Sequence, residues 1–90
     1  VGHISRDNSK LIARLRRIKG QVEGVERALE ADAECVEVLR QITSIRGAMT
    51  GLTKEVLEEH LRSHVVEATD DASREKGAED MIQILKSYFK

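Results

Sequence analysis

The sequence predicts an all-α protein. It has no proline, 34% of its 90 residues are charged and only 2% are aromatic, a composition typical of long amphipathic helices and unfavourable for a sheet. A chain this short forms at most one domain and buries a limited fraction of its surface when it folds alone. We therefore predict a single helical domain over residues 1–90 that associates with further copies of itself.

Three helices are expected after a short polar arm over residues 1–8. The first covers about 9–30, because apolar residues alternate there at spacings of four and three: Leu11, Leu15, Ile18, Val22, Val25 and Leu29. After a polar connection, the third covers about 73–89 and carries a shorter apolar pattern: Ala78, Met81, Ile82, Leu85, Tyr88 and Phe89. These patterns predict helices that pack through one face.

The second helix is expected over about 33–66 and is very long. Asp32 is a good N-cap residue and would place Cys35 in the first turn. Apolar residues then repeat at heptad spacing: Val38, Ile42, Ile45, Met49, Leu52 and Val56. Such a helix is roughly 50 Å long, whereas a compact chain of this size has a radius of gyration of about 12 Å. It therefore needs a partner chain beside it.

Cysteine and histidine residues form the candidate metal site. His60 and His64 stand four apart and share one helix face, although a solvated pair is the commoner reason for this spacing. Cys35, taken alone, is more often a small buried residue. Cys35 and His60 would lie about 37 Å apart in one unbroken helix, so one subunit cannot use both at a single ion. An antiparallel dimer would bring Cys35 of one chain to the histidines of the other, at two identical sites.

The same dimer predicts where its two helices cross. The midpoint between the ligands falls between Gly47 and Met49, and Gly51 follows one turn later. Helices that cross closely favour residues without side chains, although glycine is also tolerated on a surface. We predict a dimer crossing at Gly47, Met49 and Gly51.

A further histidine lies in the N-terminal arm. Only a short turn joins the first two helices, so the first should run antiparallel to the second, and His3 would come near His60 and His64 of its own chain. The site would offer three imidazoles and one thiolate, with the α-amine, Glu34 or water as additional ligands. Such a set suits Ni(II), Co(II) or Zn(II), whereas Cu(I) prefers more sulfur.

A basic stretch without acids marks the first helix: Lys10, Arg14, Arg16, Arg17 and Lys19. Clustered cations can bind nucleic-acid phosphates. Read alone, they are more simply a solvated helix face.

Two segments, Arg17-Ile-Lys-Gly-Gln-Val-Glu-Gly24 and Leu39-x-Gln-Ile-x-x-Ile-Arg-Gly-Ala48, together with Cys35, His60 and His64, resemble the CsoR/RcnR family over nearly the whole chain. The resemblance implies three-helix subunits that form an antiparallel four-helix-bundle homodimer and then a homotetramer, a dimer of dimers. It also implies that the tetramer releases double-stranded operator DNA when an inducer occupies a site that includes the cysteine. Arg14 and Arg17 match the family's DNA-contacting positions best.

The ligand pattern is similar to that of the nickel and cobalt sensors, with His3, Cys35, His60 and His64 all present. Copper sensors usually have a second cysteine where this chain has His64. Formaldehyde-responsive members share Cys35 and His60 but commonly have proline where this chain has Gly2.

The expected function is therefore that of a cytoplasmic, metal-sensing repressor of metal efflux that responds to Ni(II) or Co(II), and not that of an enzyme. No membrane partner is expected, because no apolar run is long enough to span a bilayer. The alternatives are a formaldehyde-responsive repressor that uses Cys35, a Zn(II)- or Cu(I)-responsive member, and a metal-storage oligomer. A hydrolase is disfavoured, because no nucleophile motif is present.

Overall fold

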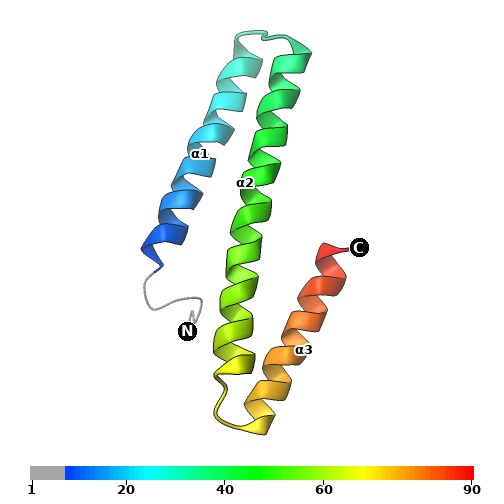
Figure 1. The fold of residues 1–90 in the computed structure, drawn as a ribbon. Helices are drawn as coiled ribbons and strands as arrows, with labels where there is room; N and C mark the ends of the chain where they lie inside the picture. The colour runs from blue at the N-terminus through cyan, green and yellow to red at the C-terminus, as the bar shows by residue number, and fades with distance from the viewer. Residues whose placement is uncertain (1–7) are drawn as a thin grey trace. The chain divides into compact units, whose positions relative to one another are not determined.

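The computed structural model describes residues 8–90. It contains α1 (Ser9–Glu30), α2 (Cys35–Leu61), a π-helical turn η1 (Arg62–Val66) and α3 (Asp71–Tyr88), as Figure 1 shows. No strand occurs in this described range. None of its helices combines the length and apolarity needed to cross a membrane. The prediction of an all-α, three-helix subunit with a very long second helix is confirmed.

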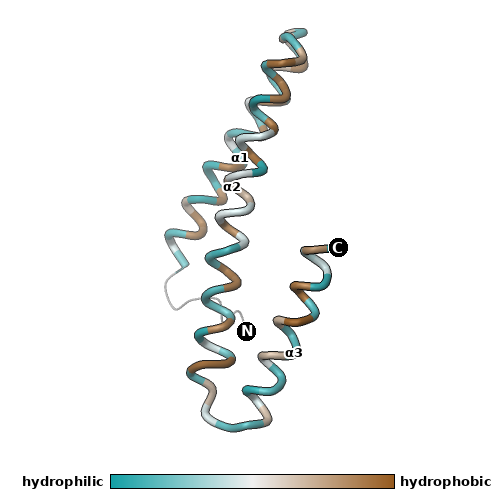
Figure 2. The backbone as a smooth tube through the Cα atoms, turned by 45° about the vertical axis from the view of Figure 1, so that its right-hand side comes forward, coloured by the Kyte–Doolittle hydropathy of each residue, from teal (hydrophilic) through white to brown (hydrophobic). Residues whose placement is uncertain are grey.

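The chain divides into two compact units, and α2 continues from one into the other. In the first, here called the hairpin unit (Asp7–Thr53), α1 and the first part of α2 run antiparallel and side by side (Figures 1 and 2). In the second, here called the histidine unit (Lys54–Lys90), the end of α2, η1 and α3 form a shorter hairpin, and α3 contacts η1. His60 and His64 lie in the second unit and Cys35 in the first.

A left-handed residue ends α1. Asp32 has a φ of 55°, and two backbone hydrogen bonds surround it, from Asp32 N to the Leu29 carbonyl (3.2 Å) and from Ala33 N to the Ala28 carbonyl (2.9 Å). This pair of bonds is the Schellman motif, which satisfies the last carbonyl groups of a helix. The prediction that Asp32 is the N-cap of the second helix is therefore wrong, because the residue closes the first helix.

Both ends of α2 differ from the predicted range of about 33–66. The backbone carbonyl of Glu34 accepts the first helical hydrogen bonds, so α2 begins at Cys35. At the other end the α-helix stops at Leu61, and Glu67 N donates to the Arg62 carbonyl at 2.9 Å, five residues back. The last five residues of the predicted helix are thus wound as a π-helix.

An N-cap starts α3 earlier than the predicted residue 73. The Asp70 carboxylate accepts hydrogen bonds from Ser73 N (2.7 Å) and Ser73 Oγ (2.9 Å). The bond from the Ser73 backbone, followed by that from its hydroxyl, lowers the pKa of Asp70 below its ordinary value of 3.8. The helix begins at Asp71, and the connection from η1 is correspondingly short.

A single chain buries little apolar surface. Within the described residues, the buried apolar side chains are Ile18 and Val38, one from each helix of the hairpin unit. Leu15, Val22 and Leu29 stand seven residues apart on α1 and are 52%, 51% and 60% exposed. Figure 2 shows apolar positions recurring along the helices. The hairpin unit therefore presents an uncovered apolar stripe along α1, defined by these three residues.

Candidate metal and DNA-binding sites

The two histidines of the histidine unit lie together. His60 is in the last turn of α2 and His64 is in η1. Their ring centroids are 4.8 Å apart and the rings are tilted by 35°. Single π-helical turns are rare and frequently occur at functional sites. The arrangement gives two imidazoles on one face of the chain, as the spacing predicted, and two such nitrogen donors suit a divalent transition metal.

A hydrogen bond defines which nitrogen of His60 is available. His60 Nε2 lies 3.0 Å from the backbone carbonyl oxygen of Gly77 in α3. A carbonyl oxygen only accepts hydrogen bonds, so a neutral His60 ring carries its proton on Nε2. Its lone pair is then on Nδ1, which is the nitrogen that could bind a metal.

Gly77 is buried where α3 meets η1. A Cβ atom built at Gly77 would lie 2.8 Å from the carbonyl carbon of His64 and 2.9 Å from its Cβ, and closer still to its carbonyl oxygen. No larger residue fits this contact without a shift of the backbone. The sequence predicted no role for Gly77. A glycine inside the predicted third helix costs about 1 kcal/mol relative to alanine, and this cost could have indicated a close contact there.

An acidic residue of α3 completes the surroundings of the histidine pair. Lys76 Nζ donates to Asp80 Oδ1 at 2.8 Å. This hydrogen bond lowers the pKa of Asp80, and the nearby His60 and His64 rings contribute smaller electrostatic effects in the same direction. Asp80 therefore stays ionised near neutral pH and supplies negative charge close to the two imidazoles.

Cys35 is exposed, with a free thiol, at the first residue of α2. His60 belongs to the last turn of the same helix. Within residues 8–90 of one chain, no three His, Cys, Asp or Glu side chains form a group able to hold a metal ion. The fourth predicted ligand, His3, lies outside the described residues.

The predicted DNA-contacting residues on α1 differ in their surroundings. Lys10, Arg16, Arg17 and Lys19 are exposed. Arg14 is only partly exposed, and its guanidinium group reaches across to α2, where a Cβ atom at Gly51 would lie 2.5 Å from Arg14 Nη2.

Of the residues predicted at the dimer crossing, Gly51 thus lies beside the flexible end of the Arg14 side chain of its own chain. Gly47 has nothing within 4 Å of where its Cβ would be, and Met49 is 41% exposed. Gly47 and Met49 are therefore accessible on the hairpin unit.

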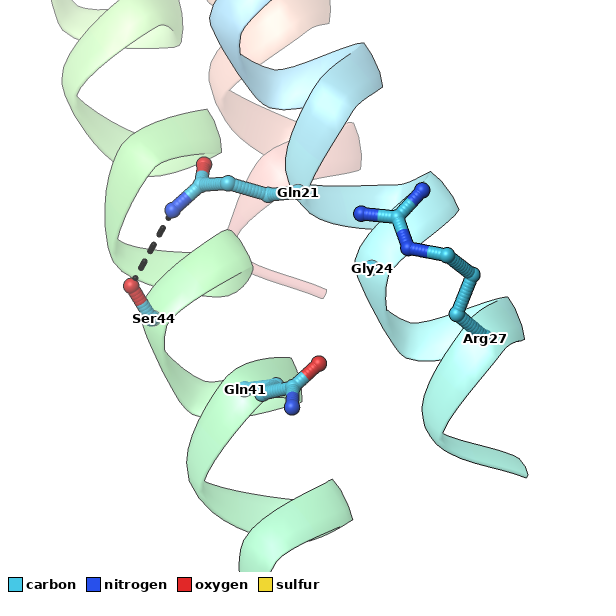
Figure 3. A pocket seen from close by; sticks show the side chains of 5 residues that line it. All are labelled: Gln21, Gly24, Arg27, Gln41 and Ser44. Carbon is cyan, nitrogen blue, oxygen red and sulfur yellow. Dashed lines mark hydrogen bonds between the residues drawn. The ribbon is translucent and has the colours of Figure 1, made fainter. Parts of the chain in front are cut away.

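A polar groove between α1 and α2 has a volume of about 400 Å³ and is lined by Gln21, Gly24, Arg27, Gln41 and Ser44 (Figure 3). Gln21 Nε2 donates to Ser44 Oγ at 3.2 Å and so ties the two helices together. Arg14 and Arg17 precede Gln21 by seven and four residues, a spacing that places them on the same face of α1. Arg14, Arg17 and the groove therefore share one face of the hairpin unit.

A second groove of the hairpin unit is apolar. It has a volume of about 570 Å³ and is lined by Val22, Val25, Glu26, Leu29, Ile42, Ile45 and Arg46. Val22 and Leu29 also belong to the exposed stripe of α1. Apolar side chains of another helix would fit against such a surface.

Comparisons with known proteins agree on one family. Residues 7–87 match the family model described as metal-sensitive transcriptional repressor. The chain is 42% identical, over the whole of both chains, to the transcriptional repressor RcnR of Salmonella paratyphi B.

Two solved structures are also similar. A variant of the formaldehyde-responsive regulator FrmR from Salmonella enterica serovar Typhimurium is 38% identical, with a TM-score of 0.86 over 97% of this chain and 99% of that one. The copper-sensing repressor CsoR with Cu(I) from Geobacillus thermodenitrificans is 28% identical, with a TM-score of 0.89 over 100% and 94% of the two chains. The chain therefore belongs to the metal-sensitive transcriptional repressors of the CsoR/RcnR family, which are regulators rather than enzymes.

Proposed function

We propose that this chain is a cytoplasmic repressor that binds operator DNA in the metal-free state and releases it when Ni(II) or Co(II) binds, so that genes for metal efflux are expressed. The observation that carries the proposal is the close pairing of the His60 and His64 rings in the histidine unit. The exposed thiol of Cys35 supplies the sulfur ligand.

The donor types favour nickel and cobalt. Imidazole nitrogen binds Ni(II), Co(II) and Zn(II), while Cu(I) prefers several soft sulfur ligands. This chain has one cysteine and three histidines. With His3 added, the set has three nitrogens and one sulfur, and Zn(II) remains a compatible alternative.

We place each metal site between two chains. Cys35 and His60 belong to opposite ends of α2, so an antiparallel partner would supply the cysteine to the histidines of the other chain. The exposed stripe of α1 and the apolar groove beside it support association, since single chains rarely leave such surfaces uncovered. The proposed assembly is a homodimer that pairs into a homotetramer.

The basic face of α1 is the proposed DNA surface. Lys10, Arg14 and Arg17 follow one another at spacings of four and three along one face of α1. Guanidinium and ammonium groups bind duplex phosphates and release counterions, so the affinity should fall steeply with salt. Arg16 and Lys19 lie off this line and would contribute mainly through long-range charge.

The direct test uses the purified protein and a DNA fragment from the promoter of its own gene. Binding would be measured by fluorescence anisotropy, without additions and with Ni(II), Co(II), Zn(II), Cu(I) or formaldehyde. We expect tight binding in the absence of metal and release by Ni(II) or Co(II). The Cys35→Ala variant should bind the DNA normally and resist release. Normal release of this variant by nickel or cobalt would overturn the proposed ligand role.

An aldehyde sensor is the second candidate, because the chain is 38% identical to the FrmR variant and has an exposed free thiol. In that case formaldehyde would release the DNA, and mass spectrometry would detect a covalent crosslink at Cys35. A metal-storage oligomer would instead bind metal without any affinity for the promoter fragment.

A further inference from the structure

We propose that Gly77 is a positioning residue for the metal site, because its lack of a side chain lets α3 approach closely enough to fix the tautomer of His60. The inference rests on the proposed metal-binding role of His60. It concerns contacts that lie wholly within the histidine unit.

The steric argument starts from the buried contact of Gly77. A Cβ atom there would overlap the backbone carbonyl group of His64, and backbone atoms cannot move aside as a flexible side chain can. Even alanine would push α3 away from η1. The carbonyl oxygen of Gly77, now 3.0 Å from His60 Nε2, would move with the helix and lose the hydrogen bond.

The chemical argument concerns the His60 ring. A neutral imidazole not bound to a partner populates both tautomers, and a hydrogen bond at one nitrogen selects between them. Donation from Nε2 to the Gly77 carbonyl keeps the lone pair on Nδ1 and makes that nitrogen a better donor. Loss of such a supporting hydrogen bond typically weakens metal binding by about 10- to 100-fold.

Two hydrogen bonds from Arg74 hold the start of α3. Arg74 Nε donates to the Val65 carbonyl at 3.1 Å, and Arg74 Nη2 donates to the Ala68 carbonyl at 2.7 Å. Arg74 thus fastens α3 to η1 and to the connection after it through hydrogen bonds in which His60 takes no part. Its removal offers a second way to loosen α3 that introduces no steric clash.

The first measurement uses the metal-free full-length protein near pH 8, where imidazole is neutral. ¹⁵N NMR of the histidine rings should show the Nε2-protonated form of His60 in the wild type and a mixture of tautomers in Gly77→Ala. Gly20→Ala is the matched control, because a Cβ atom at Gly20 meets nothing within 4 Å. Its His60 signals should match those of the wild type. An unchanged Nε2-protonated signal in Gly77→Ala would overturn the proposal.

The second measurement is a Co(II) titration followed by absorption spectroscopy. Gly77→Ala should bind Co(II) about 10- to 100-fold more weakly, whereas Gly20→Ala should match the wild type. Arg74→Ala should change the tautomer signal and the Co(II) affinity in the same direction as Gly77→Ala. If Gly77→Ala does not fold, Arg74→Ala serves as the test of the proposal. Wild-type affinity together with an unchanged tautomer in Arg74→Ala would then refute the proposal. If the wild type itself fails to bind Co(II), the proposed function fails, and the tautomer measurement still tests the role of Gly77.

Discussion

The hairpin unit and the histidine unit are built in different ways. Within the described residues, the hairpin unit has two buried apolar side chains, Ile18 and Val38, and leaves the stripe of Leu15, Val22 and Leu29 exposed. The histidine unit instead relies on close polar and backbone contacts, among them the hydrogen bond from His60 to Gly77. Exposed apolar side chains also occur in the histidine unit, among them Ile82 and Phe89. What distinguishes the histidine unit is that it holds two imidazoles in a defined geometry.

This difference indicates that the hairpin unit serves mainly in association and the histidine unit mainly in metal sensing. Surfaces that bind partners tolerate many substitutions outside their central residues. Ligand positions depend on supporting contacts that hold them within small tolerances. Substitutions in the hairpin unit, apart from the proposed ligand Cys35, should therefore alter assembly and DNA binding, and substitutions around His60 and His64 should alter the response to metal.

The largest effect is expected from a charge in the exposed stripe of α1. Val22→Asp would bury an unpaired carboxylate from each chain at the proposed interface, which costs several kcal/mol. Analytical ultracentrifugation should show a shift from oligomer to monomer. Val36→Asp is the control, because Val36 is also exposed, at 61%, but lies off the heptad pattern. If Val22→Asp remains oligomeric, the exposed stripe of α1 in the hairpin unit is not part of the interface.

A smaller and more specific effect is expected for the exposed Arg17 side chain. Arg17→Ala should weaken promoter binding and reduce the slope of log affinity against log salt by roughly one, the loss of a single phosphate contact. Arg40→Ala is the control, since Arg40 pairs with Glu37 on the surface of α2 at 2.7 Å. Salt slopes that stay equal in the two variants would exclude a phosphate contact at Arg17.

Alanine substitutions at two glycines distinguish contacts within one chain from contacts between chains. A Cβ atom at Gly20 or at Gly47 would meet nothing within 4 Å in one chain. Gly20→Ala should therefore stabilise the protein by about 0.5 to 1 kcal/mol, as alanine does inside helices. If Gly47 lies at the dimer crossing, Gly47→Ala should instead weaken the dimer. Equal stabilisation of both variants in chemical denaturation would argue against that crossing.

The smallest effect is expected at the N-cap of α3. Hydrogen bonds from Ser73 lower the pKa of Asp70, so this carboxylate contributes to stability above its unfolded pKa near 3.8, and the contribution is lost as the pH falls through the lower folded value. Asp70→Ala should reduce the Tm at neutral pH by a few degrees, and this difference should shrink in acid. Asp70→Asn keeps a capping oxygen and should retain the stability without that pH dependence. Equal Tm values for wild type and Asp70→Ala would exclude a role for the cap.

The sequence pattern predicted the positions and packed faces of the helices more accurately than the residues at which they begin and end. Apolar spacing defined the packed faces, because a helix must turn its apolar side chains to one side. Asp32 was misassigned because aspartate suits both an N-cap and a left-handed position, and only the backbone distinguishes the two. The π-helical turn at His64 has no sequence signature of comparable strength.

The candidate site was predictable only in part. Spacing alone brought His60 and His64 together, since residues four apart share a helix face. The role of Gly77 depends on how α3 packs against η1, a contact between residues distant in the sequence. The close approach of Arg14 to Gly51 was also missed, because a glycine does not reveal which neighbour fills the space beside it.

Mixed dimers test the central claim, a metal site shared between two chains, most directly. One subunit would carry Cys35→Ala and the other both His60→Ala and His64→Ala, so that a bridged dimer retains one complete site, with Cys35 and the histidine pair from different chains. Co(II) titration of the purified mixed dimer should show one site per dimer with nearly wild-type affinity, while either variant alone should bind weakly. A mixed dimer that binds Co(II) no better than its parent variants would contradict a shared site.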